Sequence, residues 1–317
     1  MTADIYNPIF QDVEKAREHL ERIRWPDGAY CPHCGEADEV HRMQGKSHAP
    51  GLHYCRSCRG KFSVTVGTLF ERSKIPLNKW MLAFHLMASS KKGISAHQLH
   101  RMLGITYKSA WFMAHRIREA MREGFKPHGM GGEGKVVEAD ETHIGGKEKN
   151  RHRNKRFGRH VGGLWGREMV FSLVERKGRV RSVHTPSVSA RTLRPILVTQ
   201  LEGSTKLMTD DAGQYRHMHR DFEHQAVNHT SGEYVRGEAH TNTVEGYFSL
   251  LKRGLTGTYH HVSPKHLKRY LAEFDFRYNY RMALEYSDAE RADKALAGIT
   301  GKRLTYRRIN GQEEARG

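Results

Sequence analysis

Two close pairs of cysteines constrain the fold of this chain most strongly. Cys31 and Cys34 form one Cys-x-x-Cys pair, and Cys55 and Cys58 form the second. Two tight turns that present thiolates in this way complete the tetrahedral coordination that Zn²⁺ prefers, and a closed four-sulfur site leaves no position for a substrate. We therefore predict a zinc ribbon over residues 28–70, with one structural Zn²⁺ held by the four cysteines.

The chain also carries a large excess of positive charge. Its 317 residues include 53 Lys and Arg against 35 Asp and Glu, a formal net charge of +18. Such an excess favours a polyanionic partner, because each neutralised phosphate releases condensed counterions. A merely basic, soluble protein is the alternative. We find no apolar run of about 18 residues and no signal-peptide pattern, so we expect a cytoplasmic protein with no membrane partner.

Helical periodicity marks two stretches before residue 125. Residues 9–24 predict an N-terminal helix, assigned to a segment over 1–27 that ends near Pro26. Residues 77–122 predict several helices with the cadence of a helix-turn-helix, in which Gly104 takes the turn and the second helix opens at Thr106. We expect a DNA-binding region over 71–125, with an ordinary helical hairpin as the alternative. The face expected to contact DNA carries Tyr107, Lys108, His115, Arg116 and Arg118.

After a glycine-rich linker at 126–134 the pattern changes to strands. Alternating runs predict two or three antiparallel strands, then a helix, a further strand and two more helices. We therefore expect a mixed α/β domain over 135–290, followed by a basic C-terminal tail over 291–317. The fold class is a multidomain α+β chain.

Three carboxylates lie at the ends of the predicted elements of this domain. Asp140 ends its first strand, Asp210 ends a later strand, and Glu245 lies at the start of a helix. Converging carboxylates suit two-metal phosphoryl transfer, in which two Mg²⁺ ions about 4 Å apart bind the attacking and leaving oxygens. Hard Mg²⁺ prefers such oxygen ligands. The sequence thus favours a magnesium-dependent site for phosphodiester chemistry.

Other interpretations of these acids stay open. Asn242 and Glu245 also form a capping-box pattern, in which Glu245 would only satisfy backbone N–H groups at the helix start. Asp210 can equally be a turn residue, and Asp140 a surface strand end. The rival acids are Glu138, which shares a strand face with Asp140, together with Glu141 and Asp211. His143 is a further candidate ligand or DNA contact.

A basic segment follows the first strand of this domain. Residues 147–160 carry seven Lys or Arg against one Glu, which fits phosphate contact, although a solvated loop is possible. The predicted DNA contacts there are Lys147, Lys149, Arg151, Arg153, Lys155 and Arg156.

Several motifs together resemble a known family. They are "RWPDGAYCPHCG", "CRSCRGKFSVTVGTLFERSKIPLNKW", "EADETHIGGKEKNRHRNKR", "TDDAGQY" and "HTNTVEGYFSLLKRGLTGTYHHVSPKHLKRYLAEFDFRYN". Over about residues 5–285 the chain resembles the bacterial insertion-sequence transposases with an N-terminal zinc ribbon and a DDE, ribonuclease-H-like catalytic domain.

The resemblance implies roles for individual residues. Asp140, Asp210 and Glu245 match the three catalytic acids, and Lys252 matches the basic residue seven positions beyond the third acid. Lys252 and its neighbour Arg253 are therefore expected at the DNA end. Some relatives use an Asn as the third residue, so Asn242 is expected to support the site.

The activity implied is DNA transposition. The protein would bind the terminal inverted repeats of its element, free a 3′-hydroxyl by hydrolysis, and use that hydroxyl to attack target DNA. It would use two Mg²⁺ or Mn²⁺ ions per active site and act in the nucleoid as a homodimer or larger assembly, because two DNA ends must be held. The alternatives are a metal-dependent nuclease that does not join strands and a zinc-ribbon transcription regulator.

Overall fold

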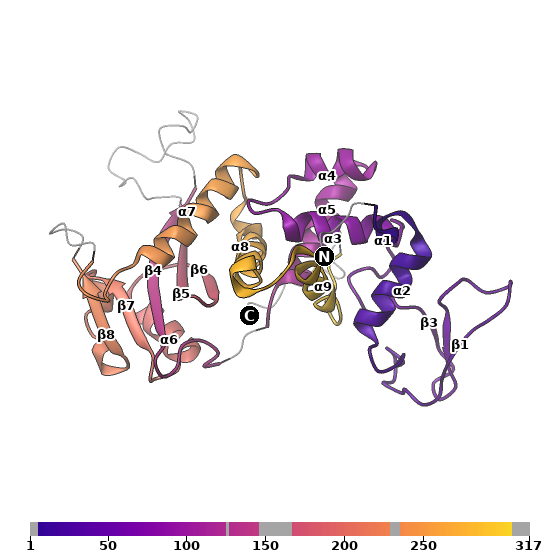
Figure 1. Ribbon diagram of the computed structural model, residues 1–317, viewed down its shortest axis with the longest axis horizontal. Coiled ribbons are helices and arrows are strands. Elements are labelled where there is room, and N and C mark those ends of the chain that lie inside the picture. Colours follow the sequence, from indigo (N-terminus) through magenta and orange to yellow (C-terminus); the bar gives the residue numbers. More distant parts are fainter. Residues whose placement is uncertain (1–5, 125–126, 146–166, 229–234, 306–317) are drawn as a thin grey trace. The chain divides into compact units, whose positions relative to one another are not determined.

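The computed structural model describes residues 6–124, 127–145, 167–228 and 235–305 (Figure 1). The chain divides into two compact units. The ribbon unit comprises the residues up to Glu123 together with those from Tyr286 onward, and the sheet unit comprises Gly124–Glu285. The six DNA contacts predicted within 147–160 lie outside the described residues.

The ribbon unit begins with two helices, α1 (Pro8–Gln11) and α2 (Val13–Arg24), where one was expected. They separate at Asp12, which has extended backbone and accepts hydrogen bonds from the N–H groups of Glu14 and Lys15. An aspartate cap of this kind satisfies the free donors of the following helix, so the chain restarts there rather than continuing.

A small antiparallel sheet follows, made of β1 (Val40–Arg42), β2 (His53–Cys55) and β3 (Lys61–Phe62). Its core is aromatic: the rings of His53 and Phe62 stack at 5.6 Å, and Trp25 packs edge-on against both. Arg24 at the end of α2 donates to the carbonyls of Val64 and Val66. These contacts fasten α2 to the ribbon.

The rest of the ribbon unit is helical, with α3 (Leu77–Ser89), α4 (Ala96–Leu103) and α5 (Tyr107–Met121). Gly104 joins α4 to α5 in the left-handed conformation, with φ of 59°. The Thr106 side chain accepts from Ser109 N–H and caps α5. The turn and the helix start therefore lie where the sequence predicts them.

Helix α9 (Asp288–Ala297) completes the ribbon unit after the chain has passed through the sheet unit. It packs against α2, α3 and α5, so the tail predicted from residue 291 begins inside a helix instead. A Cβ on Gly298 would lie 2.2 Å from the carbonyl oxygen of Ala120 on α5, which shows how closely the two backbones approach. Beyond it, Thr300 pairs with Thr68 near the ribbon.

The sheet unit is built on a five-stranded sheet of order β6-β5-β4-β7-β8. Strands β4, β5 and β6 are antiparallel neighbours, whereas β7 runs parallel to both β4 and β8. The strands are β4 (Val136–Ile144), β5 (Glu168–Glu175), β6 (Val180–Thr185), β7 (Lys206–Asp210) and β8 (Glu223–Val227). This is the mixed α/β sheet that the sequence predicts.

Helices cover both faces of this sheet (Figure 1). On one face, Val137 and Ala139 of β4 pack with α6 (Ala190–Gln200). On the other, Val170 and Val174 of β5 pack with α7 (Asn242–Gly257) and α8 (Pro264–Asn279). Because side chains alternate along a strand, Glu138 and Asp140 lie on the α7 face.

The predicted linker packs onto the sheet unit where it is described. Met130 is buried and pairs with Leu201, and Gly131 N–H donates to a carboxylate oxygen of Glu175. Gly131 has φ of 80°, and a Cβ there would lie 2.1 Å from the Thr205 hydroxyl oxygen, so the position requires glycine. Among the described helices, none has the length and apolar character needed to cross a membrane.

Candidate active site and metal centre

Asp210 ends β7, as expected, but Asp140 lies in the middle of the neighbouring parallel strand β4, because β4 stays paired with β5 as far as Ile144. The register pairs Val136 with Lys206 and Glu138 with Met208, and continuing it by two residues brings Asp140 beside Asp210. Both therefore lie on the α7 face, Asp140 in the middle of its strand and Asp210 at the carboxyl end of its own.

Helix α7 brings the third acid to the same face. It begins at Asn242 and packs on β4 and β5, and Glu245 lies in its first turn with an exposed side chain. The hydroxyl of the buried Thr241 donates to a Glu245 carboxylate oxygen at 3.1 Å. Asn242, expected to support the site, is exposed at the first position of the helix.

The electrostatics of Asp140 reflect this gathering of acids. Burial, and then the negative charges of Glu141, Asp210 and Glu245, raise the pKa of Asp140 from its ordinary 3.8 to about 7. A hydrogen bond from the Glu141 N–H opposes this rise. The three candidate acids are thus close enough to repel one another, and a cation between them would relieve that repulsion.

These carboxylates fit a divalent cation by their chemistry, because Mg²⁺ binds oxygen ligands and completes its shell with water or substrate phosphate. They are not drawn tightly together: across the described ranges, only the four cysteines form a set of three or more potential ligands whose donor atoms all lie within 4.8 Å of one another.

The capping-box interpretation of Glu245 is wrong. The residue preceding α7 is Thr241, which makes no side-chain capping bond to the helix backbone. The N–H groups of Thr243 and Val244 instead donate to Glu138 Oε2, at 2.7 and 3.0 Å. Glu138 on β4 caps the helix, so Glu245 is not needed for that purpose.

The other rival acids are placed away from the α7 face or outside the sheet. Glu141 lies on the opposite face from Asp140, where Gln214 Nε2 donates to it at 2.5 Å and the Tyr215 hydroxyl also donates. Asp211 is exposed in the turn after β7. Neither shares the position of Asp140 and Asp210.

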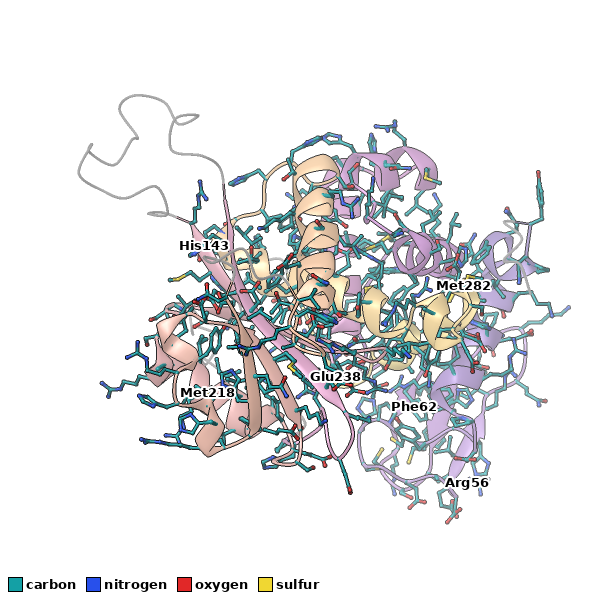
Figure 2. The ribbon with its side chains drawn as sticks, turned by 60° about the vertical axis from the view of Figure 1, so that its left-hand side comes forward. Arg56, Phe62, His143, Met218, Glu238 and Met282 are labelled. Atoms are coloured by element: carbon teal, nitrogen blue, oxygen red, sulfur yellow. The ribbon has the colours of Figure 1, made fainter. Side chains whose placement is uncertain are left out.

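Basic side chains lie near these acids. Lys252 and Arg253 are exposed on α7, two turns beyond Glu245. Burial, and then the positive charges of Arg167 and Lys252, lower the pKa of His143. Lys252 therefore lies near the end of β4, where Figure 2 labels His143.

A second basic cluster was missed in the sequence. The 3₁₀ turns η3 (Gly213–Tyr215) and η4 (Met218–Arg220) follow Asp210 directly. Tyr215 and Met218 are buried and anchor the turns (Met218 is labelled in Figure 2). The side chains left exposed are Arg216, His217, His219 and Arg220. The run "RHMHR" was the available signal.

In the ribbon unit, only some residues of the expected DNA-contacting face of α5 are exposed. Tyr107 and Lys108 are exposed, and the Tyr107 ring stacks on His97 at 4.2 Å. His115 and Arg118 are buried, contrary to expectation. Arg116 is half-buried and donates to the backbone carbonyls of Leu69 and Leu304, so its guanidinium has a structural role. The sequence suggested one exposed face, but α3, α4 and α9 all pack on this helix.

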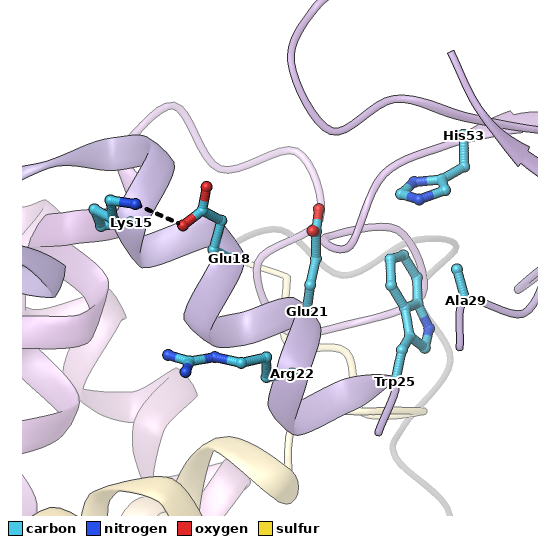
Figure 3. A pocket seen from close by; sticks show the side chains of 7 residues that line it. All are labelled: Lys15, Glu18, Glu21, Arg22, Trp25, Ala29 and His53. Atoms are coloured by element: carbon cyan, nitrogen blue, oxygen red, sulfur yellow. Dashed lines mark hydrogen bonds and ion pairs between the residues drawn. The ribbon is translucent and has the colours of Figure 1, made fainter. Parts of the chain in front are cut away.

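The four cysteines come together as a ready metal centre. The Sγ atoms of Cys31 and Cys58 are 3.6 Å apart, and so are those of Cys34 and Cys55. All four sulfur atoms lie within 4.8 Å of one another, which suits tetrahedral Zn²⁺. A separate open hollow of about 570 Å³ lies between α2 and the ribbon (Figure 3). Its lining includes Glu21, Trp25 and His53, and it carries both acidic and basic groups.

Comparisons with known proteins match parts of both units to transposase domains. An ISXO2-like transposase domain matches residues 131–279, and a transposase zinc-ribbon domain matches residues 12–61. A protein described as an uncharacterized protein in transposable element ISH50 of Halobacterium salinarum is 29% identical over 278 residues, covering 84% of this chain and 91% of that protein.

Among solved structures, the simian T-cell lymphotropic virus intasome in complex with PP2A regulatory subunit B56 gamma includes a chain with 18% identity. The match covers 56% of this chain and 67% of that one, and its TM-score of 0.27 is too low to inform the fold.

Proposed function

Because the chain belongs to the insertion-sequence transposases that combine a zinc ribbon with a DDE catalytic domain, we propose that it cuts and joins DNA at the ends of a mobile element. The proposed reaction has two steps. Water attacks a phosphodiester at the end of the element and frees a 3′-hydroxyl. That hydroxyl then attacks a phosphodiester of the target DNA, forming the new P–O bond while the P–O bond to the target's 3′-oxygen breaks and leaves a target 3′-hydroxyl.

One observation carries the proposal: Asp140, Asp210 and Glu245 come from β4, β7 and α7 to one face of the sheet. Burial raises the pKa of Asp140 to about 7, and the negative charges of Glu141, Asp210 and Glu245 add to that rise. Two Mg²⁺ or Mn²⁺ ions held there would supply charge neutralisation at the attacking and leaving oxygens. Asp140, central among the acids, would serve both ions, and Asp210 and Glu245 one each.

The chain's own groups would position the DNA. Lys252 and Arg253 on α7 would contact the phosphates next to the reacting bond, and Arg216, His217, His219 and Arg220 would extend that basic surface past Asp210. The turn between α4 and α5 would set Tyr107 and Lys108 against the terminal repeat, with the zinc-bound ribbon beside them. Two ends would require at least a dimer on DNA.

Two rival functions predict different products. A nuclease of the same fold would cut DNA without joining it, and a zinc-ribbon regulator would bind DNA without cutting. An assay on labelled terminal-repeat DNA with Mg²⁺ or Mn²⁺ separates all three, because it reports binding, cleavage and strand joining independently.

The test compares isosteric variants of the acids. Asp140→Asn, Asp210→Asn and Glu245→Gln should each lower cleavage and joining at least about 100-fold, since the loss of several kcal/mol of charge stabilisation has that effect on a rate. DNA binding and folding should survive, because shape and helix propensity barely change.

Asp211→Asn is the matched control, since Asp211 is adjacent to Asp210 in sequence but exposed in the turn. It should keep near-normal joining. Normal joining by Glu245→Gln would exclude Glu245 from the site and shift attention to Asn242, one turn earlier on the same helix.

A further inference from the structure

Glu138 is the most completely enclosed acid near the candidate active site. Its side chain is 0% exposed, although it lies on β4 only two residues before Asp140 and on the same face. A buried carboxylate is costly unless its oxygens accept hydrogen bonds or pair with cations. The groups that donate hydrogen bonds to the Glu138 carboxylate therefore indicate its role.

Four hydrogen bonds are donated to this carboxylate. Oε2 accepts from the N–H groups of Thr243 and Val244, while Oε1 accepts from the Thr243 hydroxyl at 2.8 Å and from Arg176 Nε at 2.7 Å. His240 Nδ1 also lies 3.1 Å from Oε1. Two carboxylate oxygens offer about four acceptor sites, so the carboxylate has no lone pair left for a metal ion.

Arg176 extends this contact to the segment that leads into α7. Its Nη1 donates to the carbonyl of Glu238 at 2.9 Å and its Nη2 to the carbonyl of His240 at 3.1 Å. Figure 2 labels Glu238 in this segment. Arg176 follows β5, so the carboxylate of Glu138 and the guanidinium of Arg176 hold the start of α7 against β4 and the end of β5.

A second buried contact fixes the helix further along. The Tyr247 hydroxyl donates to Asp275 Oδ1 on α8, and Ser182 on β6 donates to both oxygens of Asp275 through its N–H and hydroxyl. Glu245 lies between these two anchors. Its position relative to the sheet is thus fixed from both sides along the helix.

We propose that Glu138 is a positioning residue, which holds the first turn of α7 against β4 and so sets the separation of Glu245 from Asp140. This rests on the proposed metal-dependent function of those two acids. Glu138 acts through the helix and is not itself a ligand. Partners of this kind, one step removed from the metal, typically affect metal affinity by about 10–100-fold.

Glu138→Gln tests the proposal with an isosteric change. Whichever way the amide is turned, its NH₂ group faces donors: the Thr243 and Val244 N–H groups on one side, Arg176 Nε and the Thr243 hydroxyl on the other. In the metal-free full-length protein, hydrogen exchange over residues 240–248 should become faster. Titration with Mn²⁺, followed by electron paramagnetic resonance, should show about 10–100-fold weaker binding with the same number of ions.

Glu273→Gln is the matched control. Glu273 is also a 0% exposed glutamate of the sheet unit, paired with Arg277 on α8 and accepting from the hydroxyl of Tyr259, which follows α7, at 2.6 Å. It should lower the thermal midpoint while leaving Mn²⁺ affinity within about twofold of wild type. Arg176→Lys keeps the positive charge but loses the several N–H donors of the guanidinium. Like Glu138→Gln, it should speed hydrogen exchange over 240–248 and weaken Mn²⁺ binding. It replaces Glu138→Gln in the test if that variant does not fold.

Three results would overturn the proposal: unchanged exchange over 240–248 in Glu138→Gln, an equal loss of Mn²⁺ affinity in Glu273→Gln, or the loss of one bound ion in Glu138→Gln, which would make Glu138 a ligand. A wild-type protein that binds no Mn²⁺, or an Asp140→Asn variant that binds it normally, would contradict the proposed function instead. The exchange measurement would still decide whether Glu138 anchors α7.

Discussion

Asp140 lies where carboxylates from several elements of the sheet unit act on one another. It is bordered by acids on its own strand, on β7 and on α7, and it is largely withdrawn from water. Such a side chain destabilises the folded protein when it is ionised and no cation is bound. The effect should be visible in the stability of the metal-free protein.

In metal-free protein, Asp140→Asn should be more stable than wild type above pH 7. The folded-state pKa of about 7 exceeds the ordinary 3.8, so the wild-type cost is absent below pH 4, grows from pH 4 to pH 7, and is fully present above pH 7. Its upper limit is about 4 kcal/mol. Denaturant unfolding in EDTA at pH 5 and pH 8 measures it; a stability difference that does not grow with pH would contradict the assigned burial.

At this scale the sequence predicts some side chains well and others poorly. Asp210 was correctly assigned to a strand end, but Asp140 was not, because β4 continues to Ile144 through its pairing with β5. The role of Glu138 could not be found, because its partners Thr243 and Val244 lie 105 and 106 residues away and only the folded sheet brings them together. Arg116 looked exposed by periodicity, but its partners Leu69 and Leu304 come from distant segments.

Among the elements, the zinc ribbon depends most on a few side chains. Its strands β1, β2 and β3 span three, three and two residues, which is too little hydrogen-bonded sheet to be stable alone. Its last strand ends at Phe62, because residues 63–66 form a turn closed by a hydrogen bond from Val66 N–H to the Ser63 carbonyl. Metal binding and the packing of Trp25, His53 and Phe62 must supply the rest of the ribbon's stability.

Cys55→Ser should therefore remove the bound zinc and open the ribbon, since a missing thiolate breaks a four-ligand site whose binding energy is also folding energy. Elemental analysis should fall from one zinc per chain to nearly none, and proteolysis should become faster between residues 30 and 66. Chelation of wild type should give the same cleavage pattern, with the sheet unit intact. A variant that keeps one zinc per chain would exclude Cys55 as a ligand.

For the whole molecule, the main feature is that the ribbon unit is discontinuous in sequence. The sheet unit is one continuous stretch, whereas the ribbon unit needs α9 and the residues after it. Lys302 adds to this closure by donating to the carbonyls of Glu119, Ala120 and Arg122 at the end of α5. The sequence pattern did not reveal this, because the long-range pairing of α9 with α3 leaves no local signal.

Gly298→Ala should destabilise the ribbon unit by about 1–3 kcal/mol, because the added Cβ would lie 2.2 Å from a backbone oxygen of α5 and force the two helices apart. Hydrogen exchange should speed up in α5 and α9 and stay unchanged in the sheet unit. Gly203→Ala is the control, since nothing lies within 4 Å of a Cβ there. Equal effects of the two substitutions would contradict the close packing of α9.

The late return of α9 has a consequence for synthesis of the protein. A ribosome makes the sheet unit before it makes the helix that completes the ribbon unit, although most of the ribbon unit is made first. A polypeptide that terminates between residues 285 and 288 would contain every candidate catalytic acid yet have an incomplete ribbon unit. If the ribbon unit binds the ends of the element, as we propose, such chains would compete poorly with full-length protein for those ends.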